Sequence, residues 1–128
     1  VNVSTTKLGS LNENYFTDDK AIITLAFKDG SIAAIHYLAN GGRSFQKERL
    51  EIFCDGGVLQ MNNFRQLLGF DWPRFRKMNL WSQNKGQDDC IKSFIESIKN
   101  QTECPIAANE IFEVAEATID AAESLRKT

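Results

Sequence analysis

Alternating apolar and polar positions predict a β-hairpin early in the chain. Residues 21–27 alternate, and the apolar side chains that share one face are Ile23, Leu25 and Phe27. Residues 31–38 form a second apolar segment, with apolar side chains on both faces. Asp29-Gly30 stands between the two segments. Because glycine tolerates the positive φ of a tight primed turn, this pair predicts that the segments are joined as a hairpin.

Further strands are expected on both sides of this hairpin. Residues 48–54 alternate well, and residues 58–62 follow after a glycine-rich turn. Another pair of strands is expected between residues 64 and 81, interrupted near Asp71-Trp72-Pro73. Residues 1–6 also have the composition of a strand. The first two thirds of the chain are therefore predicted to be mainly sheet.

Two helices are predicted to close the chain. In the first, an apolar stripe recurs at i, i+3, i+4 and i+7, formed by Ile91, Phe94, Ile95 and Ile98. The second is expected to begin near Asn109, a good N-cap residue. Its predicted buried face consists of Ile111, Ala115, Thr118, Ile119, Ala122 and Leu125. Strands first and helices last favour one α+β domain over residues 1–128, with an open, largely antiparallel β-sheet and the C-terminal helices packed on one face.

The apolar content of the strands at 21–27 and 31–38 also predicts self-association. An antiparallel sheet that is open to water on one side should have a polar second face, and these strands do not supply one. We therefore expect a homodimer through the open sheet face, with Ile35 as a candidate contact residue. The alternative is that an N-terminal segment, or the residues between 64 and 81, covers this face instead.

Composition and charge exclude several classes of partner. The chain has 128 residues, of which 42% are hydrophobic and 25% charged, as expected for one globular domain. Its net charge of -2 gives no general attraction for nucleic acid or anionic lipid, and no apolar run reaches the roughly 18 residues of a membrane span. We expect neither nucleic acid nor membrane as a partner. Residues 72–77, which mix aromatic and cationic side chains, are the one segment where nucleic-acid binding is an alternative.

The sequence offers no catalytic, metal or cofactor-binding motif. The Gly-Gly pairs at 41–42 and 56–57 lie between predicted strands, so no helix N-terminus follows them to hold a pyrophosphate. His36 is the only histidine and is interpreted as structural rather than catalytic. The three cysteines, Cys54, Cys90 and Cys104, are interpreted as buried or idle thiols of a reducing cytoplasm. The chain alone is expected to bind neither NAD nor NADP.

The order of several short elements resembles the C-terminal domain of the Gfo/Idh/MocA oxidoreductases, which include glucose–fructose oxidoreductase and inositol dehydrogenase. The elements are, in chain order, Phe27-Lys28-Asp29-Gly30-Ser31, Tyr37, Lys47-Glu48-Arg49-Leu50-Glu51-Ile52, Gly56-Gly57, Asn63-Phe64-Arg65, Lys85-Gly86, Phe94, Pro105-Ile106 and Ser124-Leu125. No single element is specific, and the resemblance depends on their order and spacing from about residue 15 to residue 127.

This resemblance implies a cytoplasmic, two-domain enzyme that transfers hydride between a sugar-like substrate and NAD or NADP. In this family the nucleotide-binding domain and the motifs that carry the catalytic lysine and histidine precede the matched region. Neither motif occurs here. Because the chain opens on Val1 rather than on methionine, we expect it to lack an N-terminal nucleotide-binding domain and to be inactive alone. No catalytic residue is assigned.

The resemblance also implies where substrate binds. It places the loop of residues 40–47 toward the inter-domain cleft, where Arg43 and Lys47 are candidate substrate-binding cations for a hydroxylated or acidic sugar. The alternative is that both are solvated surface charges. A second function, a stand-alone non-catalytic α+β module for ligand binding or assembly, also fits the sequence.

Overall fold

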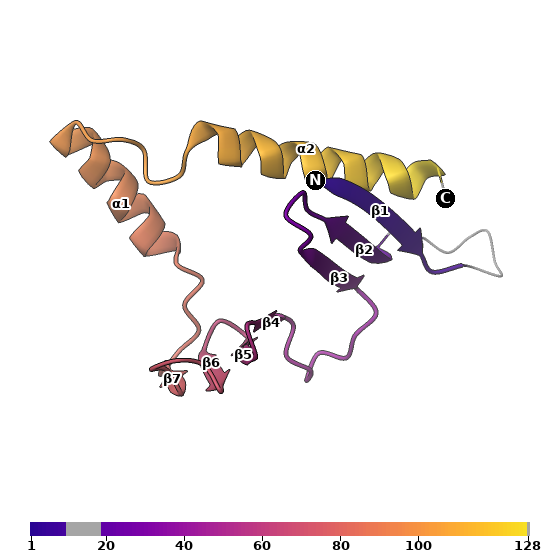
Figure 1. Ribbon diagram of the computed structural model, residues 1–128, viewed down its shortest axis with the longest axis horizontal. Coiled ribbons are helices and arrows are strands. Elements are labelled where there is room, and N and C mark those ends of the chain that lie inside the picture. The colour runs from indigo at the N-terminus through magenta and orange to yellow at the C-terminus, as the bar shows by residue number, and fades with distance from the viewer. Residues whose placement is uncertain (10–18, 128) are drawn as a thin grey trace. The chain divides into compact units, whose positions relative to one another are not determined.

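The chain divides into two compact units, which we describe separately. The computed structural model describes residues 1–9 and 19–127. The first unit comprises Val1–Gly41 and Glu103–Thr128, and the second comprises Gly42–Thr102. Each unit combines an open antiparallel sheet with one helix, so the predicted α+β class is confirmed (Figure 1). The strands form two sheets rather than the single sheet that we expected, because no strand pairing in the described residues joins the two sets.

The sheet of the first unit, sheet A, contains β1 (Asn2–Lys7), β2 (Lys20–Ala26) and β3 (Ile32–Leu38), in that order. The predicted hairpin joins β2 to β3, but its turn differs from the prediction. The Gly30 N–H donates to the Phe27 carbonyl oxygen at 3.1 Å, and the Phe27 N–H donates to the Ser31 carbonyl oxygen at 2.9 Å. Only Gly30, with φ 90°, has a positive φ in this turn. A primed two-residue turn needs a positive φ at its first central residue, which this turn lacks. The chain therefore uses a three-residue loop closed by a glycine bulge.

The second helix, α2 (Ala108–Lys127), packs on β1. The Thr5 hydroxyl donates to the Ser124 hydroxyl oxygen at 2.8 Å, and Lys7 Nζ donates to the Leu125 carbonyl oxygen at 3.3 Å. The strand register extends this α2-facing side over the sheet as Val3, Thr5 and Lys7, then Ala21, Ile23 and Leu25, then Ala33, Ile35 and Tyr37. Ala21 and Ala121 are the most buried apolar residues at this contact.

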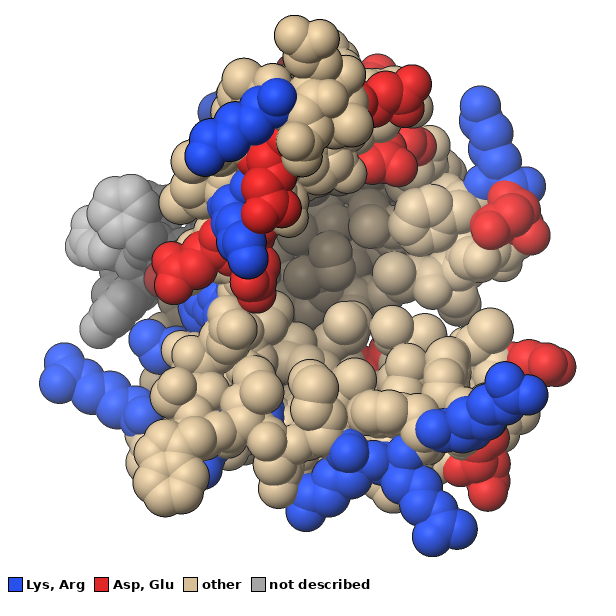
Figure 2. Space-filling view, turned by 90° about the vertical axis from the view of Figure 1, so that its left-hand side faces the viewer, with Lys and Arg blue, Asp and Glu red and all other residues tan. Residues whose placement is uncertain are grey.

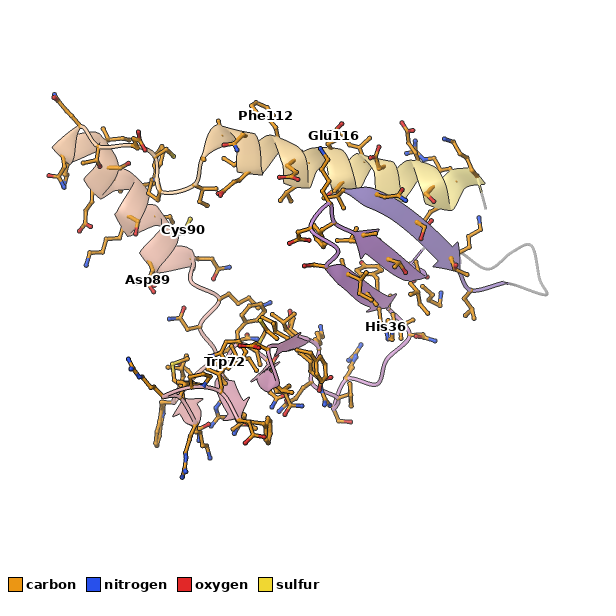
Figure 3. The ribbon with its side chains drawn as sticks, in the orientation of Figure 1. His36, Trp72, Asp89, Cys90, Phe112 and Glu116 are labelled. Atoms are coloured by element: carbon orange, nitrogen blue, oxygen red, sulfur yellow. The ribbon has the colours of Figure 1, made fainter. Side chains whose placement is uncertain are left out.

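Of the six residues predicted from periodicity to form the buried face of α2, Leu125 is half-buried and the other five are exposed. The residues that are buried or half-buried are Ala117, Ala121, Ser124 and Leu125, whereas Ile111, Ala115, Thr118, Ile119 and Ala122 are exposed. Small side chains let the helix approach β1 closely, which large apolar ones would prevent. Phe112 is 72% exposed and points away from sheet A (Figure 3). The helix also begins one residue early, since the Ala107 carbonyl oxygen accepts its first hydrogen bonds and Asn109 lies inside the first turn.

The sheet of the second unit, sheet B, is a meander of β4 (Arg49–Cys54), β5 (Gly57–Asn62), β6 (Gln66–Phe70) and β7 (Lys77–Asn79). These strands confirm the two pairs predicted between residues 48 and 81. Asp55 and Gly56 join β4 to β5 with φ values of 47° and 78°. Positive φ at both central positions is the geometry of a type I′ turn, for which Asp-Gly is a favoured pair.

Sheet B has one apolar face and one face on which polar and apolar side chains are mixed. Its register aligns two apolar rows, Leu50-Met61-Leu67-Met78 and Ile52-Leu59-Gly69. On the other face the Asn62 amide donates to Gln66 Oε1 at 3.1 Å. The Glu51 carboxylate there accepts a hydrogen bond of 2.9 Å from Gln60 and also contacts Arg49. These contacts hold the pKa of Glu51 below its usual range, the Arg49 hydrogen bond contributing most.

The remaining helix, α1 (Gln87–Asn100), belongs to the second unit and contains the predicted stripe of Ile91, Phe94, Ile95 and Ile98. It carries Asp88 and Asp89 in its first turn and Lys99 in its last, which complements the helix dipole. Its predicted apolar stripe is between 43% and 62% exposed, so α1 does not cover a face of sheet B, the sheet of its own unit. Within the described ranges, neither helix has the length and hydropathy that crossing a membrane requires.

Candidate ligand-binding pocket

An open pocket in the second unit brings together Arg43 and Lys47, the two site residues predicted from the sequence. Its volume is about 460 Å³. The lining residues are Arg43, Ser44, Phe45, Gln46, Lys47, Glu48, Asn63, Gln83 and Lys85. They come from three segments, namely the loop before β4, the β5–β6 turn and the connection between β7 and α1. All three lie in the second unit, so every residue that lines the pocket belongs to that unit.

Glu48 joins the three segments of the pocket wall. Its backbone carbonyl oxygen accepts the Asn63 N–H at 2.7 Å, which fastens the loop before β4 to the β5–β6 turn. Its carboxylate oxygen Oε1 lies 2.7 Å from Lys85 Nζ, which fastens the same loop to the connection before α1. The two cations of the loop, Arg43 and Lys47, therefore extend from a segment that is tied at its end to both other walls.

The β5–β6 turn is built from two residues with left-handed backbone conformation. Asn63 and Phe64 both have φ 50°, and the Arg65 N–H closes the turn on the Asn62 carbonyl oxygen at 3.0 Å. Asparagine adopts this conformation readily, but for phenylalanine it is uncommon and carries strain. Lys85 Nζ lies 5.6 Å from the centre of the Phe64 ring, a cation–π contact that favours this placement.

Two side-chain amides complete the polar lining. Gln83 Nε2 donates to both the backbone oxygen and Oδ1 of Asn63, at 3.1 Å and 3.0 Å. This leaves the Gln83 carbonyl oxygen and the Asn63 NH₂ group without a partner in the part of the chain that the structure describes. One acceptor and one donor are the groups that a ligand hydroxyl can satisfy together.

Sequence reasoning did not identify Asn63, Gln83 or Lys85 as site residues. Asn63 and Lys85 were noted only as parts of the elements that resemble the oxidoreductase family. Each contributes through a contact that spans 15 residues of sequence or more, such as the one between Lys85 and Glu48. Local pattern carries no signal for such contacts, and only the folded unit brings these groups together.

Other chemically active residues lie away from this pocket. His36 is exposed on β3, on the face of sheet A opposite α2, where its cross-strand partner is Ile22, which pairs in turn with Thr6 (Figure 3). The three cysteines are exposed and unpaired, so of the two expected alternatives, buried or idle thiols, the buried one is wrong. In the ranges 1–9 and 19–127 no group of three or more His, Cys, Asp or Glu side chains is arranged to hold a metal ion.

The segment 72–77, where nucleic-acid binding was an alternative, uses its first aromatic residue for packing. A β-carbon at Gly57 would lie 3.1 Å from Cε3 of Trp72, and one at Gly69 would lie 3.1 Å from Cβ of Trp72. These glycines let Trp72 approach sheet B, which leaves the side chain half-buried rather than free to stack on a base. In the view of Figure 2, both cationic and acidic side chains are present, and uncharged surface lies between the groups of charged side chains.

No known protein family, curated protein or solved structure matches this chain. The resemblance to the C-terminal domain of the Gfo/Idh/MocA oxidoreductases therefore rests on the order of the sequence elements alone.

Proposed function

We propose that this chain is the substrate-binding and dimerisation domain of an NAD(P)-dependent oxidoreductase that acts on a sugar or another polyhydroxylated substrate. The order of the sequence elements supports the family. One structural observation supports the role: Arg43 and Lys47 line a single pocket with the amides of Asn63 and Gln83. Charged donors and amides converging on one concave surface are typical of sites that bind polar, hydroxylated ligands.

In this proposal the chain binds and orients the substrate, and chemistry belongs to another part of the enzyme. NAD or NADP would be held by a preceding nucleotide-binding domain, which also supplies the acid–base groups. The pocket would hold the sugar while hydride passes between a carbinol carbon and the nicotinamide ring. The chain alone is then inactive, and the enzyme works in the cytoplasm.

The test is a steady-state assay of the natural enzyme with NAD and NADP and a panel of sugars and sugar acids. Arg43→Ala and Lys47→Ala should each raise KM and leave kcat nearly unchanged, because they remove binding groups that act equally in the ground and transition states. Lys28→Ala, which changes an exposed cation in the first unit, is the matched control. Unchanged KM in both pocket variants would count against the proposal.

A stand-alone, non-catalytic ligand-binding module is the second candidate. The observation that favours it is that every residue lining the pocket belongs to the second unit, so the pocket needs no other domain to be complete. Saturable sugar binding by a protein that shows no oxidation or reduction of any nicotinamide cofactor would favour this candidate over the enzyme.

A further inference from the structure

The pocket carries an excess of positive charge that its own residues do not balance. Glu48 is the only acidic residue of its lining, and Lys85 already neutralises it at 2.7 Å. Arg43 and Lys47 form no ion pair with any residue of the described ranges. Two positive charges therefore remain in a chain whose formal net charge is -2.

The amides add a second kind of recognition beside these charges. The Asn63 NH₂ group and the Gln83 carbonyl oxygen suit hydroxyl groups, since a hydroxyl both donates and accepts. Their mutual hydrogen bonds fix these two amides in position before any ligand arrives. A pocket with unpaired cations and preorganised amides fits a ligand that carries an anionic group and hydroxyls on the same molecule.

We propose that this pocket selects an anionic sugar over a neutral one. Arg43 and Lys47 bind a carboxylate or phosphate group of the sugar, and Asn63 and Gln83 bind its hydroxyls. This inference rests on the proposed function only in taking the pocket as the substrate site, and it narrows the substrate to one class. Guanidinium and ammonium groups recognise carboxylate and phosphate by the same charge-assisted hydrogen bonds.

The Glu48–Lys85 ion pair then determines how strongly the pocket attracts an anion. While Lys85 neutralises Glu48, its carboxylate does not repel the ligand. Removing Lys85 exposes that negative charge beside the two binding cations, and removing the Glu48 charge releases a third cation. The pair is thus a specificity-determining element of the pocket, whether or not either side chain touches the ligand.

The first experiment titrates the 128-residue chain with four probes and follows its ¹H–¹⁵N NMR spectrum, including side-chain amides. Glucuronate or glucose 6-phosphate should shift the Asn63 and Gln83 amide signals at concentrations where glucose does not. Comparison of these two probes distinguishes a carboxylate from a phosphate. Equal responses to glucose and to both anions, or no response to either anion, would overturn the inference. Inorganic phosphate binding as tightly as glucose 6-phosphate would overturn it too, because the amides would then add no affinity for the sugar hydroxyls.

The second experiment is a charge cycle measured with the anionic probe that binds. Lys85→Met should weaken binding by about threefold to tenfold, and Glu48→Gln should strengthen it by a similar factor. The double variant restores the original charge balance and should bind within about twofold of the unchanged chain. If the pair only fastened the wall, both single variants would weaken binding and the double variant would not recover it, which would contradict the specificity role.

Failure of this inference and failure of the proposed function have different signatures. Turnover of a neutral sugar by the natural enzyme, with no anion selectivity in the titrations, keeps the function and removes the inference. Selective anion binding without any nicotinamide-dependent turnover keeps the inference and removes the function. NMR signal dispersion in each variant identifies any that fail to fold, and for those the variants Lys85→Gln and Glu48→Ala, which make the same changes of charge, provide the measurement.

Discussion

Gly69 is a residue at which an added methyl group has no room. A β-carbon there would lie 2.6 Å from the Phe75 backbone carbonyl oxygen and 3.0 Å from Cδ1 of its ring. Because a backbone atom cannot move aside as a flexible side chain does, Gly69→Ala should reduce the free energy of unfolding by about 1–3 kcal/mol. Urea unfolding followed by tryptophan fluorescence measures this. Gly42→Ala, where no atom lies within 4 Å, is the control, and equal effects of the two substitutions would refute the packing argument.

Asp29 makes the hairpin of the first unit sensitive to acid. The Ser31 backbone N–H lies 2.9 Å from Oδ1 of Asp29, and this hydrogen bond is the main cause that holds the pKa of Asp29 below its usual range. A lowered pKa in the folded state means that the ionised carboxylate stabilises the fold. This stability is present above the unfolded pKa of about 3.9 and is lost as pH falls through the folded value.

We therefore expect the urea midpoint of the chain to fall below about pH 4, and Asp29→Asn should make that fall less steep. The Glu51 carboxylate, whose pKa is also lowered, contributes a fall of the same sign. Glu51→Gln combined with Asp29→Asn should consequently flatten the dependence further. A single Asp29→Asn variant with an unaltered pH dependence would show that the hydrogen bond to Ser31 adds nothing to stability.

Among the pocket residues, Arg43 and Lys47 could be predicted from the sequence, whereas Gln83 could not. The two cations are assigned because the family resemblance places the loop of residues 40–47 toward the substrate. Gln83 joins the pocket through Asn63, across 20 residues and two strands. Phe64 shows the same limit, since nothing in an Asn-Phe pair predicts a left-handed backbone at the phenylalanine.

At the scale of elements, the buried face of α2 is set by packing against sheet A and not by the periodicity of its apolar residues. Ala121 is 8% exposed and belongs to the buried stripe of the helix, whereas its neighbour Ala122 is exposed. Ala121→Leu should lower the free energy of unfolding by about 1–3 kcal/mol, because the larger side chain would push α2 from sheet A. Ala122→Leu makes the identical change on the solvent side and should stay within about 0.5 kcal/mol. Chemical denaturation of both variants gives the comparison, and a reversed order would support the face predicted from the sequence.

The spans of the helices and strands could be predicted because they follow from local periodicity and turn residues. Asp55-Gly56 predicts its turn for this reason, since both residues accept positive φ. The buried face of α2 could not be predicted in this way. Its apolar residues mark several sides of the helix, and the side that packs is set by close approach to Thr5 and Lys7 on β1, more than 110 residues away in the chain.

At the scale of the molecule, the division of the strands into two sheets could also not be predicted from the local sequence pattern. Each hairpin is determined by its own turn, but nothing between Leu38 and Arg49 signals whether β3 and β4 pair. The structure assigns them to different sheets and different units. The pocket depends on this division, because the loop that carries Arg43 and Lys47 opens the second unit and is tied to that unit's own turns.

The predicted homodimer remains a prediction, and the strand register changes which residues would carry it. Ile35 aligns with Ile23 and Thr5 and so belongs to the side of sheet A that faces α2. The open side instead presents Ile32, which is 80% exposed, and Leu38, which is 56% exposed.

If two copies associate through the open face of sheet A, burial of these apolar side chains is the main driving force and a charge there would oppose it. Ile32→Lys should then raise the dimer dissociation constant by about tenfold or more, as measured by sedimentation velocity across a micromolar concentration series. Ile35→Lys, the matched variant on the α2 side of the same strand, should leave the dissociation constant nearly unchanged. A chain that sediments as a monomer at high micromolar concentration would exclude the dimer. If Ile35→Lys dissociated the dimer and Ile32→Lys did not, the dimer contact would lie on the side of sheet A that faces α2.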